Sequence, residues 1–230
     1  MTHRSKATSE FYLKNSPFLG WGTKESKLDP ERCALLEKYL VGNKVLDVGC
    51  GSGIYVGFIN SLGFESWGLD FVKEFVKEAQ KKVRGRFMQG RAEKLPFEKE
   101  EFDTVLLFDI LEHGDDSIIL KEALRVVSKR VIFIVPRTVD EELASSGVIF
   151  RHYLDKSHLR EYTEKDIVIL AQKLKVKLKV LKPAHALYNE TIYWSLFNGP
   201  VLLKKIIRKA TLLVLPSKKY FTEYFVVLDK

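Results

Sequence analysis

Cysteine is scarce in this chain, which has only Cys33 and Cys50 among its 230 residues. Two thiols so far apart in the sequence provide neither a disulfide framework nor a zinc site built from cysteine pairs. An apolar stretch typical of a secretion signal is also absent near the N-terminus. We therefore expect a cytoplasmic protein.

Internal repeats and low-complexity tracts are absent as well. The hydrophobic content of 46% is enough for a sizeable core, and 230 residues suit one large domain or one domain with a cap. Basic residues exceed acidic ones, which gives a net charge of +8. The surface is therefore expected to attract RNA, anionic lipid headgroups or anionic metabolites.

Glycine is concentrated in residues 44–53, KVLDVGCGSG. Residues 44–48 have the branched apolar pattern of a buried strand, and Gly49, Gly51 and Gly53 then lead into a helical pattern. Glycine lets the backbone approach a ligand closely. A strand, a glycine turn and a helix in this order are typical of the first ligand-binding loop of a doubly wound α/β sheet.

Asp47 indicates which ligand this loop binds. A dinucleotide fingerprint requires G-x-G-x-x-G, but Ile54 stands where the third glycine should be. A carboxylate just before the turn would also repel a pyrophosphate, whereas it would attract a cation. An NAD-dependent oxidoreductase is therefore disfavoured.

The stretch resembles motif I of the class I S-adenosylmethionine-dependent methyltransferases, acid-x-Gly-x-Gly-x-Gly. This resemblance implies S-adenosylmethionine as the cofactor. It also implies that the residues of the turn bind it, namely Asp47, Gly49, Cys50, Gly51 and Gly53.

Asp70 ends a second predicted strand, residues 65–70, about 20 residues after the glycine turn. Nucleotide-binding folds place an acid there to accept hydrogen bonds from both ribose hydroxyls. We expect this role for Asp70, with Phe71 beside the adenine.

Residues 90–97, GRAEKLPF, resemble the adenine-contacting loop G-D-A-E-x-L-P-F of methyltransferases of ubiquinone and menaquinone biosynthesis. The resemblance places Arg91, Ala92 and Glu93 at the cofactor. Arg91 departs from the pattern, because it has no acceptor for the adenine amino group where many relatives have Asp. The backbone amide of Ala92 remains able to donate to the ring.

The pattern F-D-x-V, five residues and L-E-H, residues 102–113, resembles the fourth strand and following loop of the same family. The resemblance places Phe108 at the cofactor and His113 beside the transferred methyl group. His113 is either a general base or a group that orients the loop or substrate.

The pattern H-x-R-x-Y-T, residues 158–163, also resembles this family. We expect His158, Tyr162 and, from the N-terminal arm, Tyr12 to bind the substrate. The candidate metal ligands in this region are His152, Asp155 and His158. Side chains three residues apart on a strand do not point to one place, and no fourth acidic or thiol ligand is evident. No metal is expected.

The predicted fold is α/β: a doubly wound, mostly parallel sheet of seven strands with helices on both faces. The resemblance makes the last strand antiparallel. We divide the chain into an N-terminal arm or lid (1–27), a methyltransferase domain (28–187), a helical cap insertion (188–219) and the last strand (220–230).

Residues 199–216 of the insertion have the pattern of a basic amphipathic helix that is too short and too charged to cross a bilayer. It is expected to roof the acceptor pocket by packing on the sheet or on the aromatic residues Tyr188, Tyr193, Trp194 and Phe197. A dimer contact and a peripheral membrane contact remain alternatives, and the oligomeric state stays open.

These patterns together predict a methyltransferase that transfers a methyl group from S-adenosylmethionine to a small molecule. Residues 108–111 read Phe-Asp-Ile-Leu and lack the N-P-P-Y type of tetrapeptide found in methyltransferases of nucleic-acid amino groups, so nucleic acid is possible but not favoured. The alternatives are a cofactor-binding module without activity and an RNA or lipid methyltransferase.

Overall fold

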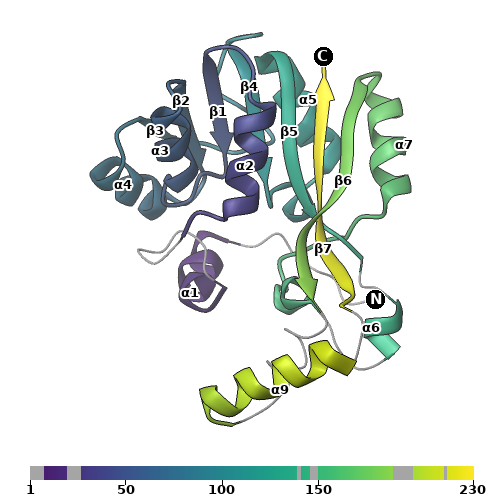
Figure 1. Cartoon of the computed structure of the whole chain (residues 1–230). Coiled ribbons are helices and arrows are strands. Elements are labelled where there is room, and N and C mark those ends of the chain that lie inside the picture. Colours follow the sequence, from purple (N-terminus) through teal and green to yellow (C-terminus); the bar gives the residue numbers. More distant parts are fainter. Residues whose placement is uncertain (1–7, 20–26, 139–140, 146–149, 189–198, 215–216) are drawn as a thin grey trace.

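The computed structural model describes residues 8–19, 27–138, 141–145, 150–188, 199–214 and 217–230, and the description below concerns these residues. They form one seven-stranded sheet in the order β3-β2-β1-β4-β5-β7-β6 (Figure 1). The strands are β1 (Lys44–Val48), β2 (Glu65–Asp70), β3 (Arg86–Gln89), β4 (Phe102–Phe108), β5 (Val127–Pro136), β6 (Lys177–Tyr188) and β7 (Lys219–Asp229).

The strands β1 to β5 pair in parallel, and β7 runs antiparallel to both β5 and β6. Parallel strands need crossover connections, and a helix provides each of them from β1 to β5 except the one between β3 and β4. The predicted doubly wound sheet with an antiparallel last strand is therefore confirmed.

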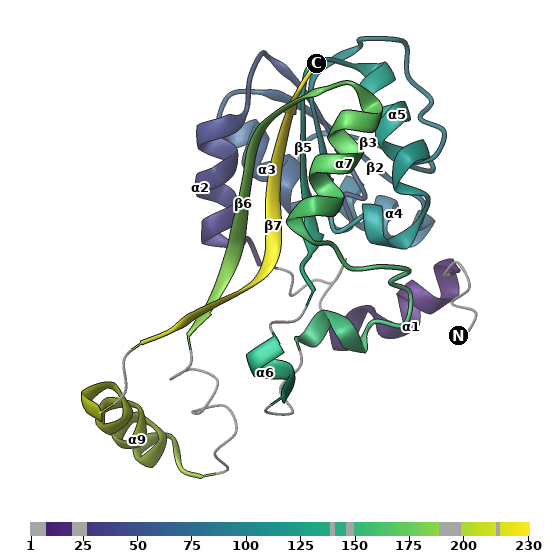
Figure 2. The ribbon, with the colours of Figure 1, turned by 90° about the vertical axis from the view of Figure 1, so that its right-hand side faces the viewer.

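Helices cover both faces of the sheet, as Figure 2 shows. One face is covered by α2 and α3, whose apolar residues Leu36 and Ile59 join a core cluster with Leu106 and Ile132. On the other face Leu120 of α5 and Ile167 of α7 pack against a second cluster. The helices are α1 (Ser9–Leu19), α2 (Pro30–Tyr39), α3 (Ile54–Ser61), α4 (Lys73–Lys82), α5 (Asp116–Val126), α6 (Glu141–Ser145), α7 (Glu164–Leu174) and α9 (Val201–Val214), with 3₁₀ turns η1 (Leu111–His113) and η2 (Arg151–Leu154).

Three helices begin at side-chain caps. Asp29 accepts a hydrogen bond from the Arg32 amide at the start of α2, and Asp115 caps α5. Thr163 opens α7 in a capping box with Asp166. These caps fix the residue at which each helix begins.

Two elements differ from the expectation. The N-terminal arm contains the helix α1 at residues 9–19, where no period was evident. The strand β6 reaches Tyr188, the first residue of the predicted insertion, and pairs with β7 as far as Lys219. Its Pro183 is tolerated because β6 lies at the edge of the sheet, where a missing amide hydrogen costs no ladder bond on the open side.

The predicted basic amphipathic helix exists as α9, but it does not pack on the sheet. It lies beyond the far ends of β6 and β7 in both views (Figures 1 and 2). Leu202 is 72% exposed and Ile206 is 55% exposed. Tyr193, Trp194 and Phe197, the proposed packing partners, lie outside the described residues. No helix in the described part of the chain is both long and apolar enough to cross a bilayer.

Candidate active site

A cavity of about 370 Å³ opens at the carboxyl ends of β1, β2 and β4. The glycine turn after β1, the end of β2 and the loop after β4 line it, together with Tyr12 of α1. The helix α1 lies beside the strand ends, so the N-terminal segment helps to enclose the cavity (Figure 1). Doubly wound sheets bind ligands at this position.

Backbone geometry explains the glycines of the turn. Gly49, Gly51 and Gly53 all have positive φ angles, +80°, +52° and +77°, which side chains rarely adopt. A Cβ at Gly49 would overlap Ile110, and one at Gly53 would lie 2.8 Å from the Phe87 ring. Gly49, Cys50 and Gly51 line the cavity whereas Gly53 does not, so Gly53 shapes the turn instead of approaching a ligand.

Two buried carboxylates face this cavity. Asp47 is 3% exposed and Asp70 is 6% exposed. Asp70 accepts hydrogen bonds from the backbone amides of Gly51 (2.9 Å) and Val72 (2.8 Å), which fix its orientation. Burial raises the pKa of Asp70 to about 6. Burial and then the charge of Asp70 raise the pKa of Asp47 to about 7, so a cation in the cavity would favour both ionised forms.

Phe71 lies at the next part of the wall, where its ring meets Tyr12 edge-on at 5.3 Å. The guanidinium of Arg91 lies 5.6 Å from the centre of the same ring, and Arg91 also pairs with Glu93 at 3.5 Å. Ala92 completes this side, and all five residues line the cavity. Phe108 lines it from β4.

A second polar cluster occupies the other end of the cavity. Arg32 of α2 forms ion pairs with Asp109 and Glu223, both at 2.7 Å. Asp109 follows β4 directly and has a φ angle of +56°, an unusual value for a residue other than glycine. His185 of β6 also lines this end and lies 3.3 Å from Asp29.

His113 lies between the two ends and lines the cavity. Its ring is 5.7 Å from that of Tyr12. Its Nδ1 lies 3.0 Å from the Ser157 hydroxyl, which donates to Asp155 at 2.6 Å. The Ser157 hydroxyl has only one hydrogen, and it donates this hydrogen to Asp155. Nδ1 of His113 therefore carries a hydrogen and donates a hydrogen bond to the Ser157 oxygen, which leaves the lone pair of Nε2 available. Burial lowers the pKa of His113, so the neutral ring is favoured.

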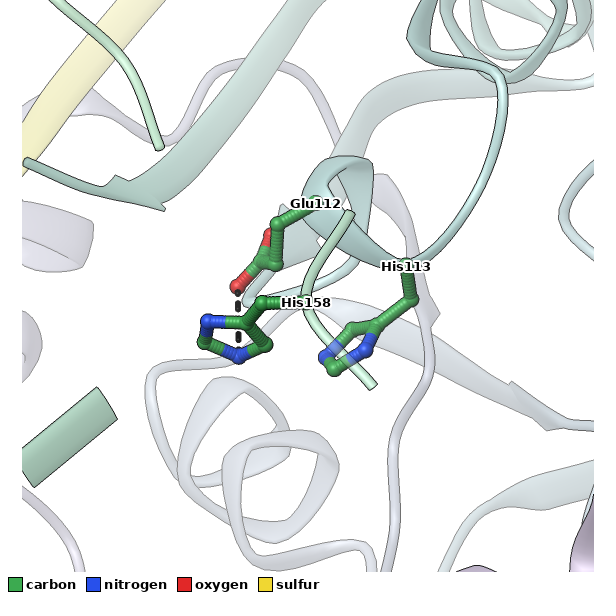
Figure 3. Close-up of side chains that lie close together, drawn as sticks. All are labelled: Glu112, His113 and His158. Atoms are coloured by element: carbon green, nitrogen blue, oxygen red, sulfur yellow. Dashed lines mark ion pairs between the residues drawn. The ribbon is translucent and has the colours of Figure 1, made fainter. Parts of the chain in front are cut away.

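Glu112 and His158 lie beside His113 (Figure 3). His158 Nε2 is 3.9 Å from Glu112 Oε1 and 3.4 Å from Asp155 Oδ2. The expectation that Asp155 and His158 would not converge was wrong, because the chain bends after η2 and does not continue as a strand. His152 stacks at 6.1 Å from His158, and burial lowers its pKa to about 4.

Comparison with known proteins agrees with this arrangement. Residues 46–135, from β1 to β5, match the sequence family described as "Methyltransferase domain". This segment, about two fifths of the chain, is therefore similar to a methyltransferase domain. The matched residues contain the glycine turn, both buried aspartates and His113.

Curated relatives of this chain include two enzymes named for quinone biosynthesis. A ubiquinone biosynthesis O-methyltransferase of Azorhizobium caulinodans is 33% identical over 102 residues, 42% of this chain and 40% of that protein. A demethylmenaquinone methyltransferase of Lactococcus lactis is 35% identical over 99 residues, 38% of this chain and 39% of that protein. The match thus spans about two fifths of either relative.

Solved structures share the fold of the methyltransferase domain over nearly the whole chain. A SAM-dependent methyltransferase of Archaeoglobus fulgidus superposes with a TM-score of 0.65 at 16% identity, covering 96% of this chain and 99% of that one. The magnesium protoporphyrin IX methyltransferase of Synechocystis, solved with bound S-adenosylhomocysteine, gives a TM-score of 0.59 at 17% identity and covers 98% and 90%.

Three predicted site residues, Gly53, His158 and Tyr162, do not line the cavity. Tyr162 is 2% exposed, belongs to the core beneath α7 and donates a hydrogen bond to Asp116 at 3.2 Å. Arg160 pairs with the same carboxylate at 2.6 Å. The motif around residue 160 therefore anchors the loop before α7, and its position gives no support to substrate binding by Tyr162.

The residues of the site that sequence reasoning missed are Arg32, Asp109, Glu112, Ser157, His185 and Glu223. Glu112 offered a signal, since it is an acid between Leu111 and His113 just after an apolar strand. Arg32 and Glu223 offered none, because 191 positions separate them and only the fold brings them together.

Proposed function

We propose that the protein is a methyltransferase that binds S-adenosylmethionine and transfers its methyl group to a small organic acceptor. The observation that carries this proposal is the pair Asp47 and Asp70, two buried carboxylates at one cavity beside a glycine turn. The cofactor combines an ammonium and a sulfonium, which carboxylates attract, with ribose hydroxyls, which donate to a carboxylate.

The cofactor end is assigned to Asp47, Gly49, Cys50, Gly51, Asp70 and Phe71, with Arg91, Ala92, Glu93 and Phe108 completing the wall. Asp70 receives the ribose hydroxyls, because its carboxylate ends β2 and is held by two backbone amides. Phe71 and Arg91, whose guanidinium lies over the Phe71 ring, form the part of the wall assigned to the adenine.

The acceptor end is assigned to the region of Tyr12, His113 and the cluster around Arg32. Methyl transfer depends mainly on placing the acceptor in line with the sulfonium, a kind of effect that supplies about 7 to 11 kcal/mol in favourable intramolecular systems. His113 contributes a lone pair on Nε2 at this position.

Two observations favour a small acceptor over a polymer. The ring of Tyr12 contacts both Phe71 and His113 and so covers part of the cavity, whose volume of about 370 Å³ suits a small molecule. The curated relatives are also named for quinone biosynthesis. We also propose a cytoplasmic location, on the scarcity of cysteine.

The experiment is an incubation with S-adenosylmethionine labelled in its methyl group and a fractionated cell extract. We expect the label in the fraction of small organic molecules, and none when Gly51→Val is used instead. Label in RNA or protein would contradict the small acceptor. Tight cofactor binding with no label in any fraction would favour a binding module without activity.

A further inference from the structure

Glu112 is a buried acid whose charge is not compensated by a hydrogen bond. Its side chain is 1% exposed, and within the described part of the chain neither carboxylate oxygen has a hydrogen-bond partner. Asp155 is 4% exposed, and among the described residues its Oδ2 also has no hydrogen-bond partner. Buried polar groups without partners are rare and costly, so a ligand for these oxygens is to be sought.

Two imidazoles lie against this acid. One ligand atom each from Glu112, His113 and His158 lies within 4.8 Å of the others. Figure 3 shows the three side chains pointing toward a common space, with one ring nitrogen of His113 directed at His158. Two ligands of a tetrahedral zinc ion lie about 3.4 Å apart, so side-chain shifts of about 1 Å would close the site.

The backbone holds these side chains in place before any ion arrives. Leu159 donates its amide hydrogen to the Glu112 carbonyl at 2.7 Å, which ties the loop of His158 to η1. Ser157 holds Nδ1 of His113, so Nε2 is left as the ligand atom. Metal-binding histidines usually have their other ring nitrogen fixed in this way.

The charges around Glu112, His113 and His158 are compatible with a bound cation. Arg32, a buried cation on the same side, is already engaged by Asp109 and Glu223. Glu112 and Asp155 bring two further carboxylates to His158.

We propose that Glu112, His113 and His158 bind one divalent transition-metal ion, with Asp155 as an adjacent carboxylate. Two imidazoles and a carboxylate suit zinc or iron, whereas magnesium and calcium prefer oxygen ligands alone. Because His113 also lines the cavity, the ion would lie at the wall beside the acceptor. His113 would then give its lone pair to the ion and would not act as a base.

The test is a calorimetric titration of the chelator-treated full-length protein with Zn²⁺, without cofactor. Its result is independent of the proposed methyl transfer. We expect one ion per chain, and binding at least tenfold weaker in Glu112→Gln and in His158→Gln. His185→Gln, which alters a histidine of the other polar cluster, serves as the control and should bind normally. Equal binding by all four proteins, or no binding by the unaltered protein, would overturn the proposal.

A second readout uses the unaltered protein and so does not depend on variants that fold poorly. Co²⁺ in a site of nitrogen and oxygen ligands absorbs visible light, and we expect one equivalent to produce such a band and one equivalent of Zn²⁺ to remove it. A Co²⁺ titration without a saturable band would also overturn the site.

Discussion

Asp70 is the single side chain on which the cofactor assignment depends most. Asp70→Asn keeps the shape of a side chain that is 6% exposed but removes its charge. We expect S-adenosylhomocysteine to bind about 1.5 to 3 kcal/mol more weakly, because the ribose loses charge-assisted hydrogen bonds. Calorimetry measures the change, with Glu74→Gln on the exposed side of α4 as the control. Unchanged affinity in Asp70→Asn would place the ribose elsewhere.

Asp47 makes a pH-dependent prediction. Its pKa of about 7 lies above the usual 3.8, so between these values the folded protein binds more protons than the unfolded chain. Its ionisation therefore reduces the free energy of unfolding as the pH rises from about 4 to about 7. At about pH 8 we expect Asp47→Asn to raise the Tm of the ligand-free protein and to increase its free energy of unfolding by about 1 kcal/mol or more. Near pH 4 we expect little change in the Tm.

The same substitution should weaken binding of S-adenosylmethionine at about pH 8, since the cation loses an ionised partner. A lower Tm at about pH 8 together with unchanged cofactor affinity would show that Asp47 has a structural role only.

Single residues near the turn could be predicted because their partners are close in sequence. Asp47 directly precedes the glycines, and Asp70 follows after one helix and one strand. Glu112 and His158 could not be paired in advance, since their contact depends on how the loop after β5 folds back. The motif around Tyr162 suggested substrate binding, although the side chain lies in the core. A motif gives the sequence position of a residue without showing whether its side chain faces the cavity or the core.

At the scale of elements, α1 closes the cavity through Tyr12. Its ring contacts Phe71 and His113 edge-on, and each such contact is worth about 0.5 to 1.5 kcal/mol. We expect Tyr12→Ala to weaken S-adenosylhomocysteine binding about tenfold by opening this wall. Lys14→Ala, an exposed change on the same helix, should have no effect. Equal affinities in calorimetry would show that α1 does not enclose the bound cofactor.

The tip of the β6–β7 hairpin offers a separate prediction. Tyr188 pairs with Lys219, so residues 189–218 can be replaced by an Asn-Gly turn that closes the hairpin. We expect this shortened protein to bind S-adenosylhomocysteine as before, because the residues proposed to bind the cofactor all lie before residue 109. If the removed segment serves as a cap, the shortened protein should lose methyl transfer. Loss of cofactor binding in a folded shortened protein would contradict this division of the chain.

The exposed apolar side of α9 also makes a lipid contact testable. Its polar side carries Lys204, Lys205 and Lys209, a composition that anionic lipids attract. Flotation with anionic liposomes at low salt compares the full and shortened proteins. Equal flotation of the two would exclude α9 as the lipid-binding element.

The differences between expectation and structure at α1 and β6 have physical reasons. Residues 9–19 form α1 although no hydrophobic period marks this segment. The strand β6 continues through Pro183 because an edge strand accommodates proline. The caps at Asp29 and Thr163, by contrast, were predictable because each acts within four residues.

At the scale of the whole molecule, the alternation of strands and helices was enough to predict the sheet, because parallel strands require crossover connections. The sequence could not show that the β6–β7 hairpin returns to the cavity. This return brings His185 and Glu223 to the end occupied by Arg32. The end proposed for the acceptor is thus assembled from both halves of the chain, whereas the end proposed for the cofactor comes from consecutive elements.

The most direct measurement of the central claim is a calorimetric titration of the unaltered protein with S-adenosylhomocysteine. We predict one ligand per chain with a Kd in the micromolar range, about −8 kcal/mol, together with a rise in Tm. NADH, which the carboxylate of Asp47 should repel through its pyrophosphate, should produce neither. The absence of heat and of thermal stabilisation with S-adenosylhomocysteine, or stabilisation by NADH alone, would contradict the account.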